Sequence, residues 1–369
     1  MDDRSYMRRA LALARRGMGR TAPNPMVGAV IVRDGRIIGE GWHARCGDLH
    51  AERHALSRCT ESAEGATIYV TLEPCCHQGR QPPCTEAVIQ AGIRRVVVGS
   101  PDPNPLVAGK GLDLLRQHGI TVETDVLRDE CDALNTVFFH YITTGTPYVV
   151  LKYAMTMDGK IACYTGLSRW VTGPEARRRV HEDRNRYTAI MVGVGTVLQD
   201  DPQLTCRIEG GRDPIRIICD SRLRTPTHAE VVRTAKTTPT ILATCCEDPA
   251  RHAPYLEAGC KVLTSAADPE GRLDLPALMK ALAADEIDSV FLEGGSTLNW
   301  SALRSGIVQR VQTYLAPKLF GGTDAPSPIG GTGADSPDGA FFLSPPEVTR
   351  LGNDILLESE VLPCVHGDR

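Results

Sequence analysis

Short apolar runs, separated by turns and by stretches of helical periodicity, predict strands that alternate with helices. Residues 67–72, 95–98, 189–194 and 289–292 are apolar at most positions, which is typical of strands buried on both faces of a sheet. Apolar residues recur at helical spacing over 6–16. The pattern predicts an α/β chain whose sheets are mostly parallel.

Turn residues delimit further elements. Asp34-Gly35 predicts a hairpin between strands at 27–32 and 37–39. One helix over 130–142 is expected to close the first half of the chain. Thr172-Gly173-Pro174-Glu175 has the form of a capping box and predicts the start of a helix that runs to about 185.

Near the C-terminus, residues 320–339 are rich in Gly, Pro and Ser. We expect this segment to be a long mobile loop. It would join two closing strands, one at 310–317 and the other at 348–357.

The length of 369 residues leaves room for about two domains. Small and polar residues with Gly145 and Pro147 at 143–147 indicate a linker, so we expect domains at 1–145 and 146–369. With 42% hydrophobic and 23% charged residues, the composition is that of an ordinary globular protein. Since no run reaches the eighteen apolar residues of a membrane helix, we expect no membrane partner.

With a net charge of -4, the chain lacks the basic character of nucleic-acid-binding domains. We therefore expect a small-molecule substrate and no nucleic-acid partner. Thirteen cysteines, an odd number scattered over a long chain, indicate reduced thiols and metal ligands. The N-terminus lacks the apolar region of a signal peptide. Together these features predict a cytoplasmic protein.

Residues 50–84 contain the most informative pattern. His50 and Glu52 are followed by Pro74-Cys75 and by Cys84. One imidazole and two thiolates form a three-ligand zinc site whose fourth position is left for water, as in catalytic sites. Zinc lowers the pKa of that water to about 7, and Glu52 is the candidate proton carrier. The pattern is the signature of zinc nucleobase deaminases.

The ligand set and the residues around it leave alternatives. Cys76 or His77 could also reach a metal, but Cys75 directly follows the proline and is preferred. The loop before the second cysteine carries Arg80, a possible phosphate or substrate contact.

Other polar residues have two interpretations each. Asn24 could bind a base edge and His43 a substrate oxygen, or they could be a capped turn and a solvated histidine. The segment 293–298 could bind phosphate at a helix N-terminus, or could be a tight turn without a ligand. Leu198 stands where a dinucleotide fingerprint after Gly193 needs its third glycine or alanine, so that interpretation is weak.

The two halves together resemble the bifunctional riboflavin-biosynthesis deaminase/reductase family over nearly the whole chain. The first half carries PNPMVG at 23–28, GWH at 41–43, HAE at 50–52, TLEPC at 71–75, GRQPPC at 79–84 and DPNP at 102–105. The second half carries LKYA at 151–154, DGK at 158–160, SRWVT at 168–172, GTV at 195–197, DDPQLT at 200–205 with Arg207, and EGG at 293–295.

This resemblance implies a cytidine-deaminase-like three-layer α/β/α domain with zinc at 1–145, and a dihydrofolate-reductase-like α/β domain with NADPH at 146–369. NADPH would contact Ala154, Trp170, Thr196, Asp200, Ser221, Gly295, Ser296, Thr297, Leu298, Asn299, Trp300 and Ser301. The phosphoribosyl substrate would contact Ser168, Arg184, Leu204, Arg207 and Glu293. Guanidinium groups suit phosphate because they bind it in bidentate fashion.

The resemblance also implies two sequential reactions. In the first, zinc-bound hydroxide attacks the pyrimidine carbon that bears the exocyclic amine of 2,5-diamino-6-(5-phosphoribosylamino)pyrimidin-4-one, and ammonia leaves. In the second, NADPH delivers hydride to C1 of the opened sugar, with Lys152 as a candidate for assisting. We expect a homo-oligomer, either a dimer or a tetramer.

Two rival functions remain. A nucleic-acid-editing deaminase would share the zinc chemistry, although the acidic balance disfavours it. A metabolite-binding protein without turnover would not need Glu52.

Overall fold

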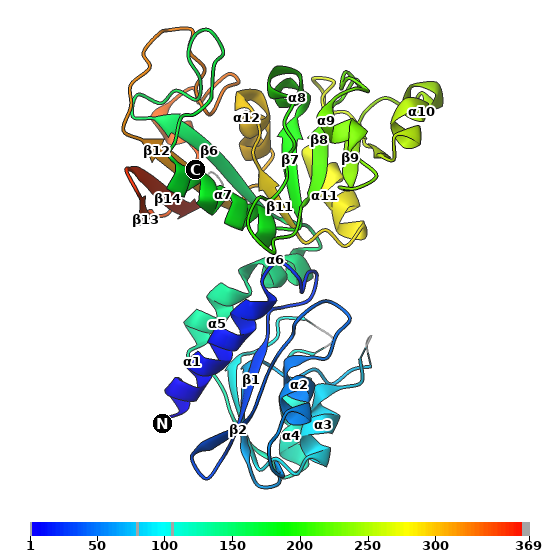
Figure 1. Cartoon of the computed structure of the whole chain (residues 1–369), viewed down its shortest axis with the longest axis vertical. Coiled ribbons are helices and arrows are strands. Elements are labelled where there is room, and N and C mark those ends of the chain that lie inside the picture. The colour runs from blue at the N-terminus through cyan, green and yellow to red at the C-terminus, as the bar shows by residue number, and fades with distance from the viewer. Residues whose placement is uncertain (1, 79–80, 105–106, 364–369) are drawn as a thin grey trace. The chain divides into compact units, whose positions relative to one another are not determined.

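The computed structural model describes residues 2–78, 81–104 and 107–363. They divide into two compact units, the first ending at Thr146 and the second beginning at Pro147 (Figure 1). Each has its own sheet and its own hydrophobic core. In the part of the chain that the structure describes, no helix is both long and apolar enough to cross a membrane.

The N-terminal unit contains a five-stranded sheet in the order β2-β1-β3-β4-β5. Its strands are β1 Gly28–Arg33, β2 Arg36–Trp42, β3 Thr67–Leu72, β4 Arg95–Ser100 and β5 Thr121–Glu123. Strand β1 is antiparallel to both neighbours, whereas β3, β4 and β5 are parallel. The predicted hairpin at Asp34-Gly35 is confirmed, and both residues have positive φ, as a two-residue hairpin turn requires.

Helices cover both faces of this sheet because alternate strand residues point in opposite directions. Ala29 and Ile31 pack in one cluster, and Val30 and Val32 pack in another. The first cluster includes α2 Ala51–Ser57, α3 Cys84–Gln90 and α4 Lys110–Gln117, and the second includes α1 Asp3–Ala14 and α5 Arg128–Leu134. The expected three-layer α/β/α arrangement is therefore confirmed (Figure 1).

Helix α2 lies unusually close to strand β2. A Cβ atom added to Gly41 would meet the backbone nitrogen of Ala55 at 2.2 Å and the carbonyl oxygen of Ala51 at 2.5 Å. Only glycine fits at such a distance. This contact fixes the helix whose N-cap residue is His50.

The C-terminal unit contains a nine-stranded sheet in the order β10-β9-β8-β7-β11-β6-β12-β14-β13. Its strands are β6 Tyr148–Thr156, β7 Ala189–Gly193, β8 Ile215–Cys219, β9 Thr240–Thr244, β10 Lys261–Thr264, β11 Ser289–Leu292, β12 Arg310–Ala316, β13 Glu347–Leu351 and β14 Asp354–Glu360. The strands from β10 to β12 pair in parallel, and β14 pairs antiparallel with β12 and β13. The predicted mostly parallel sheet is confirmed.

Helices also pack on both faces of this sheet. They are α7 Pro174–Arg186, α8 Val194–Asp200, α9 Glu230–Arg233, α10 Pro249–Glu257, α11 Leu275–Ala284 and α12 Ser296–Arg304. Met191 packs in one cluster with α11 and α12, whereas Ile190 and Val192 pack in another with α8, α9 and α10. Strand β7 leads directly into α8, and β11 leads into α12 through residues 293–295.

Three predicted elements were wrong in detail. The helix expected over 130–142 is two helices, α5 and α6 Thr136–Thr144. Asn135 interrupts them because its side chain accepts from the N–H of Met26 and donates to the carbonyl of the same residue. The closing strand expected at 348–357 is the hairpin β13-β14. The chain turns there at Gly352, whose φ is +64°.

The third difference is at the start of α7. The expected capping box is not formed, because Gly173 is the N-cap and no side chain caps the helix. The N–H of Gly173 instead donates to the Asp354 carboxylate at 2.7 Å. That partner lies on β14 and is not visible in local sequence.

Candidate functional site

Three side chains that could hold a zinc ion meet at one end of the N-terminal sheet. His50 is the N-cap of α2, with extended backbone, and Cys84 is the first residue of α3. Cys75 lies just beyond the end of β3. The Nδ1 atom of His50 is 3.6 Å from the Sγ of Cys75 and 3.4 Å from the Sγ of Cys84.

These distances fit a tetrahedral ion. Ligands at zinc distances of about 2.0 Å for nitrogen and 2.3 Å for sulfur stand roughly 3.6 Å apart. The three ligand atoms lie within 4.8 Å of one another, and no other His, Cys, Asp or Glu of the described residues joins the group. Cys76 and His77 are therefore outside it. One imidazole and two thiolates leave a fourth position for water.

The surroundings of Cys75 favour its thiolate form, which metal binding needs. The adjacent Cys84 thiol lowers the pKa of Cys75 to about 4, and His50 adds to this effect. The N–H of Cys84 donates to the Cys75 sulfur at 3.4 Å. The first residue of α3 therefore both supplies one ligand and stabilises another.

Glu52 lies in the first turn of α2 and is only 3% exposed. Its carboxylate is hydrogen-bonded with the Cys84 side chain. Burial, with the negative charge of Cys75, raises the pKa of Glu52 to about 7. A carboxyl group with such a pKa can both accept and donate a proton near neutral pH.

Asn24 and His43 lie beside the ligand cluster. The His43 ring is buried and its centre is 5.3 Å from that of His50, so the alternative of a solvated histidine is wrong. Burial lowers the pKa of His43 and favours the neutral ring. Nδ1 lies 3.1 Å from the carbonyl of Leu49 and Nε2 lies 3.2 Å from the Asn24 amide nitrogen. Donation by Nδ1 and acceptance by Nε2 leave the Asn24 carbonyl oxygen available to a substrate.

Sequence reasoning gave no role to Glu73, two residues before Cys75. This buried carboxylate accepts hydrogen bonds from the N–H groups of Asp102, Gly109 and Gly111 at 3.1 to 3.3 Å. It thereby fixes the described parts of the loop after β4 next to the ligand. The position of Glu73 between the end of a strand and the Pro-Cys pair is the sequence feature that could have indicated its role. Arg80, the expected phosphate or substrate contact, lies outside the described residues.

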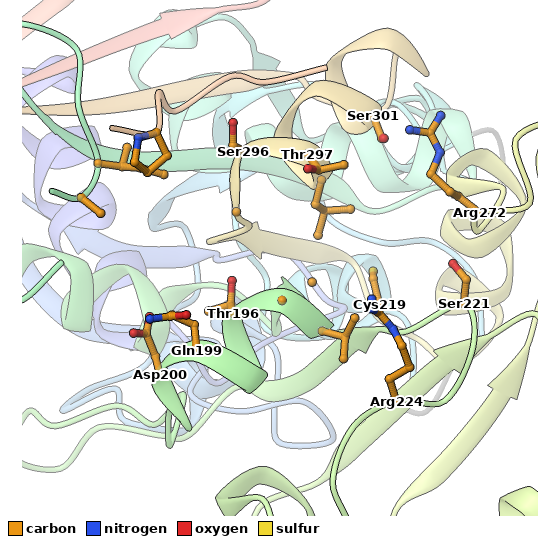
Figure 2. A pocket seen from close by; sticks show the side chains of 18 of the residues that line it. Thr196, Gln199, Asp200, Cys219, Ser221, Arg224, Arg272, Ser296, Thr297 and Ser301 are labelled. Carbon is orange, nitrogen blue, oxygen red and sulfur yellow. The ribbon is translucent and has the colours of Figure 1, made fainter. Parts of the chain in front are cut away.

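The C-terminal unit contains a cavity of about 570 Å³ at the ends of β7 and β11 (Figure 2). Most of the expected cofactor residues line it, as does the expected substrate residue Ser168. The cofactor residues are Thr196, Asp200, Ser221, Gly295, Ser296, Thr297, Leu298 and Ser301.

The remaining expected cofactor residues do not line the cavity. Asn299 is buried and donates to the carbonyl of Pro328, while Trp300 packs against Phe341. Trp170 is 59% exposed, with the Arg177 guanidinium over its ring. Ala154 packs in a small cluster with residues of α7.

Two helix N-termini meet at this cavity. Helix α8 begins after Gly193 and helix α12 after Gly295, and neither has a side chain that caps its first turn. Backbone N–H groups are therefore left for a ligand, and the helix dipoles favour a negative charge. The cavity fits the pyrophosphate of a dinucleotide, which favours the phosphate-binding interpretation of 293–298.

Three charged side chains meet beside the end of β11. Glu293 accepts from Lys152 Nζ at 3.3 Å and from Arg184 at 2.7 and 3.2 Å. Burial alone would raise the pKa of Glu293, but the two cations lower it to about 2. Glu293 therefore occupies two N–H groups of Arg184. A third N–H group of Arg184 donates to the carbonyl of Thr205.

The other expected substrate residues lie on the segment after α8. Leu204 is buried and has a φ of +55°. Arg207 is exposed and donates to the Gln203 side chain at 3.1 Å. No acidic residue in the described ranges forms an ion pair with Arg207.

Known proteins match both units. Residues 1–100 match the model of the cytidine and deoxycytidylate deaminase zinc-binding region, and residues 147–357 match that of the RibD C-terminal domain. Riboflavin biosynthesis protein RibD of Actinobacillus pleuropneumoniae is 52% identical over 98% of this chain and 96% of its own length. The protein of the same name from Escherichia coli is 44% identical over 87% and 89%.

Solved structures agree with these matches. RibD of Acinetobacter baumannii superposes with a TM-score of 0.88 at 37% identity, covering 98% of this chain and 99% of its own. A diaminohydroxyphosphoribosylaminopyrimidine deaminase/5-amino-6-(5-phosphoribosylamino)uracil reductase of Thermotoga maritima gives 0.85 at 38% identity, with the same coverage. These likenesses confirm the deaminase-like and dihydrofolate-reductase-like folds. The chain therefore belongs to the RibD family of riboflavin biosynthesis proteins, and it is a bifunctional enzyme with a zinc-dependent deaminase and an NADPH-dependent reductase activity.

Proposed function

We propose that this enzyme deaminates 2,5-diamino-6-(5-phosphoribosylamino)pyrimidin-4-one and then reduces the ribosyl group of the product to ribityl phosphate. The name of the Thermotoga maritima relative describes this pair of activities. The observation that carries the proposal is the convergence of His50, Cys75 and Cys84 around buried Glu52. We assign deamination to residues 1–145 and reduction to residues 146–369, and the division between the two compact units at Thr146 supports this assignment.

For deamination, His50, Cys75 and Cys84 would hold the zinc. When bound, zinc lowers the pKa of a water ligand and so supplies hydroxide at neutral pH. Glu52 accepts a proton and gives it to the exocyclic nitrogen, which leaves as ammonia. The Asn24 carbonyl oxygen, set by the contact with His43, accepts from a donor on the pyrimidine edge. Arg80 stays a proposed substrate contact.

For reduction, NADPH supplies the hydride. Residues at the starts of α8 and α12 would hold its pyrophosphate through their backbone N–H groups. Lys152 keeps its ammonium beside Glu293 and provides the proton for the heteroatom that becomes negative when C1 of the sugar is reduced. Ala154, Trp170, Asn299 and Trp300 do not line the cavity, and we propose that they support it.

The substrate phosphate is better assigned to Arg207 than to Arg184. Arg184 is mostly buried and bound to Glu293 through two N–H groups. Arg207 is exposed and keeps donors available, and guanidinium is well suited to phosphate. Leu204 and Ser168 would then contact the sugar and base between Arg207 and the cofactor.

A coupled assay tests the proposal. Purified enzyme receives the diaminopyrimidine ribotide, ammonia and NADPH are followed separately, and zinc is measured in the same sample. We expect about one zinc per chain, ammonia release without NADPH, and NADPH oxidation only after deamination. Ammonia release from a zinc-free sample would contradict the role of zinc, and NADPH oxidation that precedes ammonia release would contradict the order of steps.

We further propose that the protein works in a reducing compartment, the cytoplasm, as a homo-oligomer. The described cysteines are all free thiols, as is usual in such compartments. Strand β13 stands at the edge of its sheet with most residues exposed, and exposed edges can pair with a second chain. Light scattering on the purified protein would give the number of chains, and we expect two or four.

A further inference from the structure

Two arginines stand at one end of the cofactor cavity. Arg224 and Arg272 line it together with Ser221 and Ser301, and Figure 2 shows both side chains on the opposite side of the pocket from Asp200. Cavity walls near a bound cofactor are usually apolar with few polar groups. Two guanidinium groups at one end indicate a ligand that carries negative charge there.

The turn that carries Arg224 is built rigidly. The fully buried Asp220 accepts from the N–H groups of Arg224 and Thr225 at 2.6 and 2.7 Å, and from the Thr225 hydroxyl at 2.8 Å. Leu223, within the turn, has a φ of +48°, a conformation that costs free energy for a branched residue. The hydrogen bonds to the buried Asp220 carboxylate hold this strained turn and so fix the backbone from which Arg224 extends.

The loop that carries Arg272 is tied to this turn. The N–H of Leu273 donates to the Ser221 hydroxyl at 3.1 Å, which sets the spacing between the two arginine-bearing segments. Asp268 and Glu270 pair with Arg272 and offset part of its charge. Among the described residues no acidic group pairs with Arg224, which is the less neutralised cation.

The order of the strands shows which end of the cofactor lies here. The sequence β8-β7-β11-β6 places α8 and α12, which follow β7 and β11, in the middle. Lys152 is on β6, and Ser221 and Arg224 follow β8. If the pyrophosphate lies at the helix N-termini and hydride transfer occurs beside Lys152, as proposed above, the nicotinamide would point toward β6. The adenosine half would then point toward β8 and the two arginines.

We propose that Arg224, assisted by Arg272, binds the 2′-phosphate of the adenosine ribose and makes the reductase selective for NADPH over NADH. The 2′-phosphate is the only group by which the two dinucleotides differ. It is a dianion near neutral pH, and guanidinium binds phosphate in bidentate, charge-assisted fashion. The proposal rests on the assignment of this cavity to the cofactor.

Equilibrium binding tests the proposal without turnover. Dissociation constants for NADPH and NADH, and for the fragments 2′,5′-ADP and 5′-AMP, are measured by calorimetry on wild-type protein and on Arg224→Ala. We expect the variant to bind NADPH and 2′,5′-ADP about 10- to 100-fold more weakly, as for the loss of a hydrogen-bonded charge. Binding of NADH and 5′-AMP should change less than about twofold.

Arg222→Ala is the matched control, because Arg222 lies on the same turn but does not line the cavity; it should bind all four ligands like wild type. Arg272→Ala should lose less than Arg224→Ala, since Asp268 and Glu270 already offset its charge. Should Arg224→Ala fail to fold, Arg224→Lys keeps the positive charge but lacks the bidentate guanidinium group. Its affinity for NADPH should fall by an intermediate amount, and its affinity for NADH should not change.

The outcomes separate the two claims. If wild-type protein does not bind 2′,5′-ADP, the assignment of the cavity is wrong. If it binds 2′,5′-ADP but the folded Arg224 variants weaken NADPH and NADH equally, or neither, then the role of Arg224 in selectivity is overturned.

Discussion

Glu52 separates the two activities at the scale of one residue. It is buried beside the ligand cluster but is not a ligand, so Glu52→Gln should keep zinc and lose the proton carrier. We expect ammonia release to fall by about two to four orders of magnitude, the usual contribution of general acid-base catalysis. Zinc content by metal analysis, and NADPH oxidation with the deaminated intermediate, should stay at wild-type levels. If both activities vanish in a well-folded variant, the division into two sites is wrong.

A second prediction concerns Glu293 and the dependence of stability on pH. Its pKa is lowered from 4.5 to about 2 in the folded protein, so its stabilising effect is complete above pH 4.5 and is lost as pH falls toward 2. Glu293→Gln should lower the free energy of unfolding by about 3 to 5 kcal/mol at pH 7, as for other broken buried pairs. Denaturant unfolding of both proteins at several pH values should show the difference shrinking below pH 4.5.

The control for this prediction is Glu347→Gln. That side chain is 75% exposed where it pairs with Arg310, and such pairs contribute about 0 to 1 kcal/mol. A difference between wild type and Glu293→Gln that stays constant down to pH 3 would contradict the origin of the effect.

Sequence spacing was enough to bring His50, Cys75, Cys84 and Glu52 into one hypothesis, because the zinc chemistry limits which residue types can combine. It could not reveal that Arg184 is bound to Glu293. The two residues lie 109 positions apart, and the meeting depends on how α7 packs. Arg224 was missed although the resemblance placed Ser221, three residues earlier, at the cofactor, because local sequence does not show that the Arg224 side chain also lines the cavity.

At the scale of elements, the segment after β12 packs on helix α12. The N–H of Gly330 donates to the carbonyl of Ser296, and Gly331 lies against the Trp300 ring, where an added Cβ would come within 2.1 Å. The segment expected to be a mobile loop is therefore joined by these contacts to a helix that borders the cofactor cavity.

Gly331→Ala tests this contact, and Gly333→Ala is its matched control. Both glycines have positive φ, at +75° and +77°, but a Cβ at Gly333 would meet nothing within 4 Å. Each alanine should cost about 1 to 2 kcal/mol of backbone strain, and Gly331→Ala about 1 to 3 kcal/mol more from overpacking. Thermal unfolding and NADPH binding measure the two effects. Equal losses in both variants would show that the ring contact contributes nothing.

The boundaries of elements followed the sequence where local residues decide them. The Asp34-Gly35 hairpin is an example, since those two residues tolerate positive φ. The break at Asn135 did not follow, because its cause is a pair of hydrogen bonds to Met26 on a distant segment. The single strand expected at 348–357 contains a turn at Gly352. The Gly-Asn pair at 352–353 is a turn signal, but the prediction gave it less weight than the strand pattern around it.

At the scale of the whole molecule, the two functions draw on different parts of the chain. The proposed zinc ligands all precede Thr146, and the residues that line the proposed cofactor cavity all follow Pro147. Removing zinc with a chelator should therefore abolish ammonia release and leave NADPH oxidation on the deaminated intermediate unchanged. Added zinc should restore ammonia release. Loss of both activities on chelation would indicate that the metal also supports the second unit.

The α/β class was predictable because buried strands leave continuous apolar runs in the sequence. The exact order of nine strands was not, since it depends on contacts between residues far apart. The order β8-β7-β11-β6 is nevertheless the basis of the cofactor orientation that we propose. Sequence patterns therefore located the chemistry more completely than they located the geometry around it.

The close approach of α2 to β2 has an implication for how this enzyme can vary. A methyl group at Gly41 has no room, so it would push away the segment that holds both the imidazole and the proton carrier. Ligand and acid-base group would then move together. We therefore expect any substitution of Gly41 to abolish deamination at once, without a partly active intermediate variant.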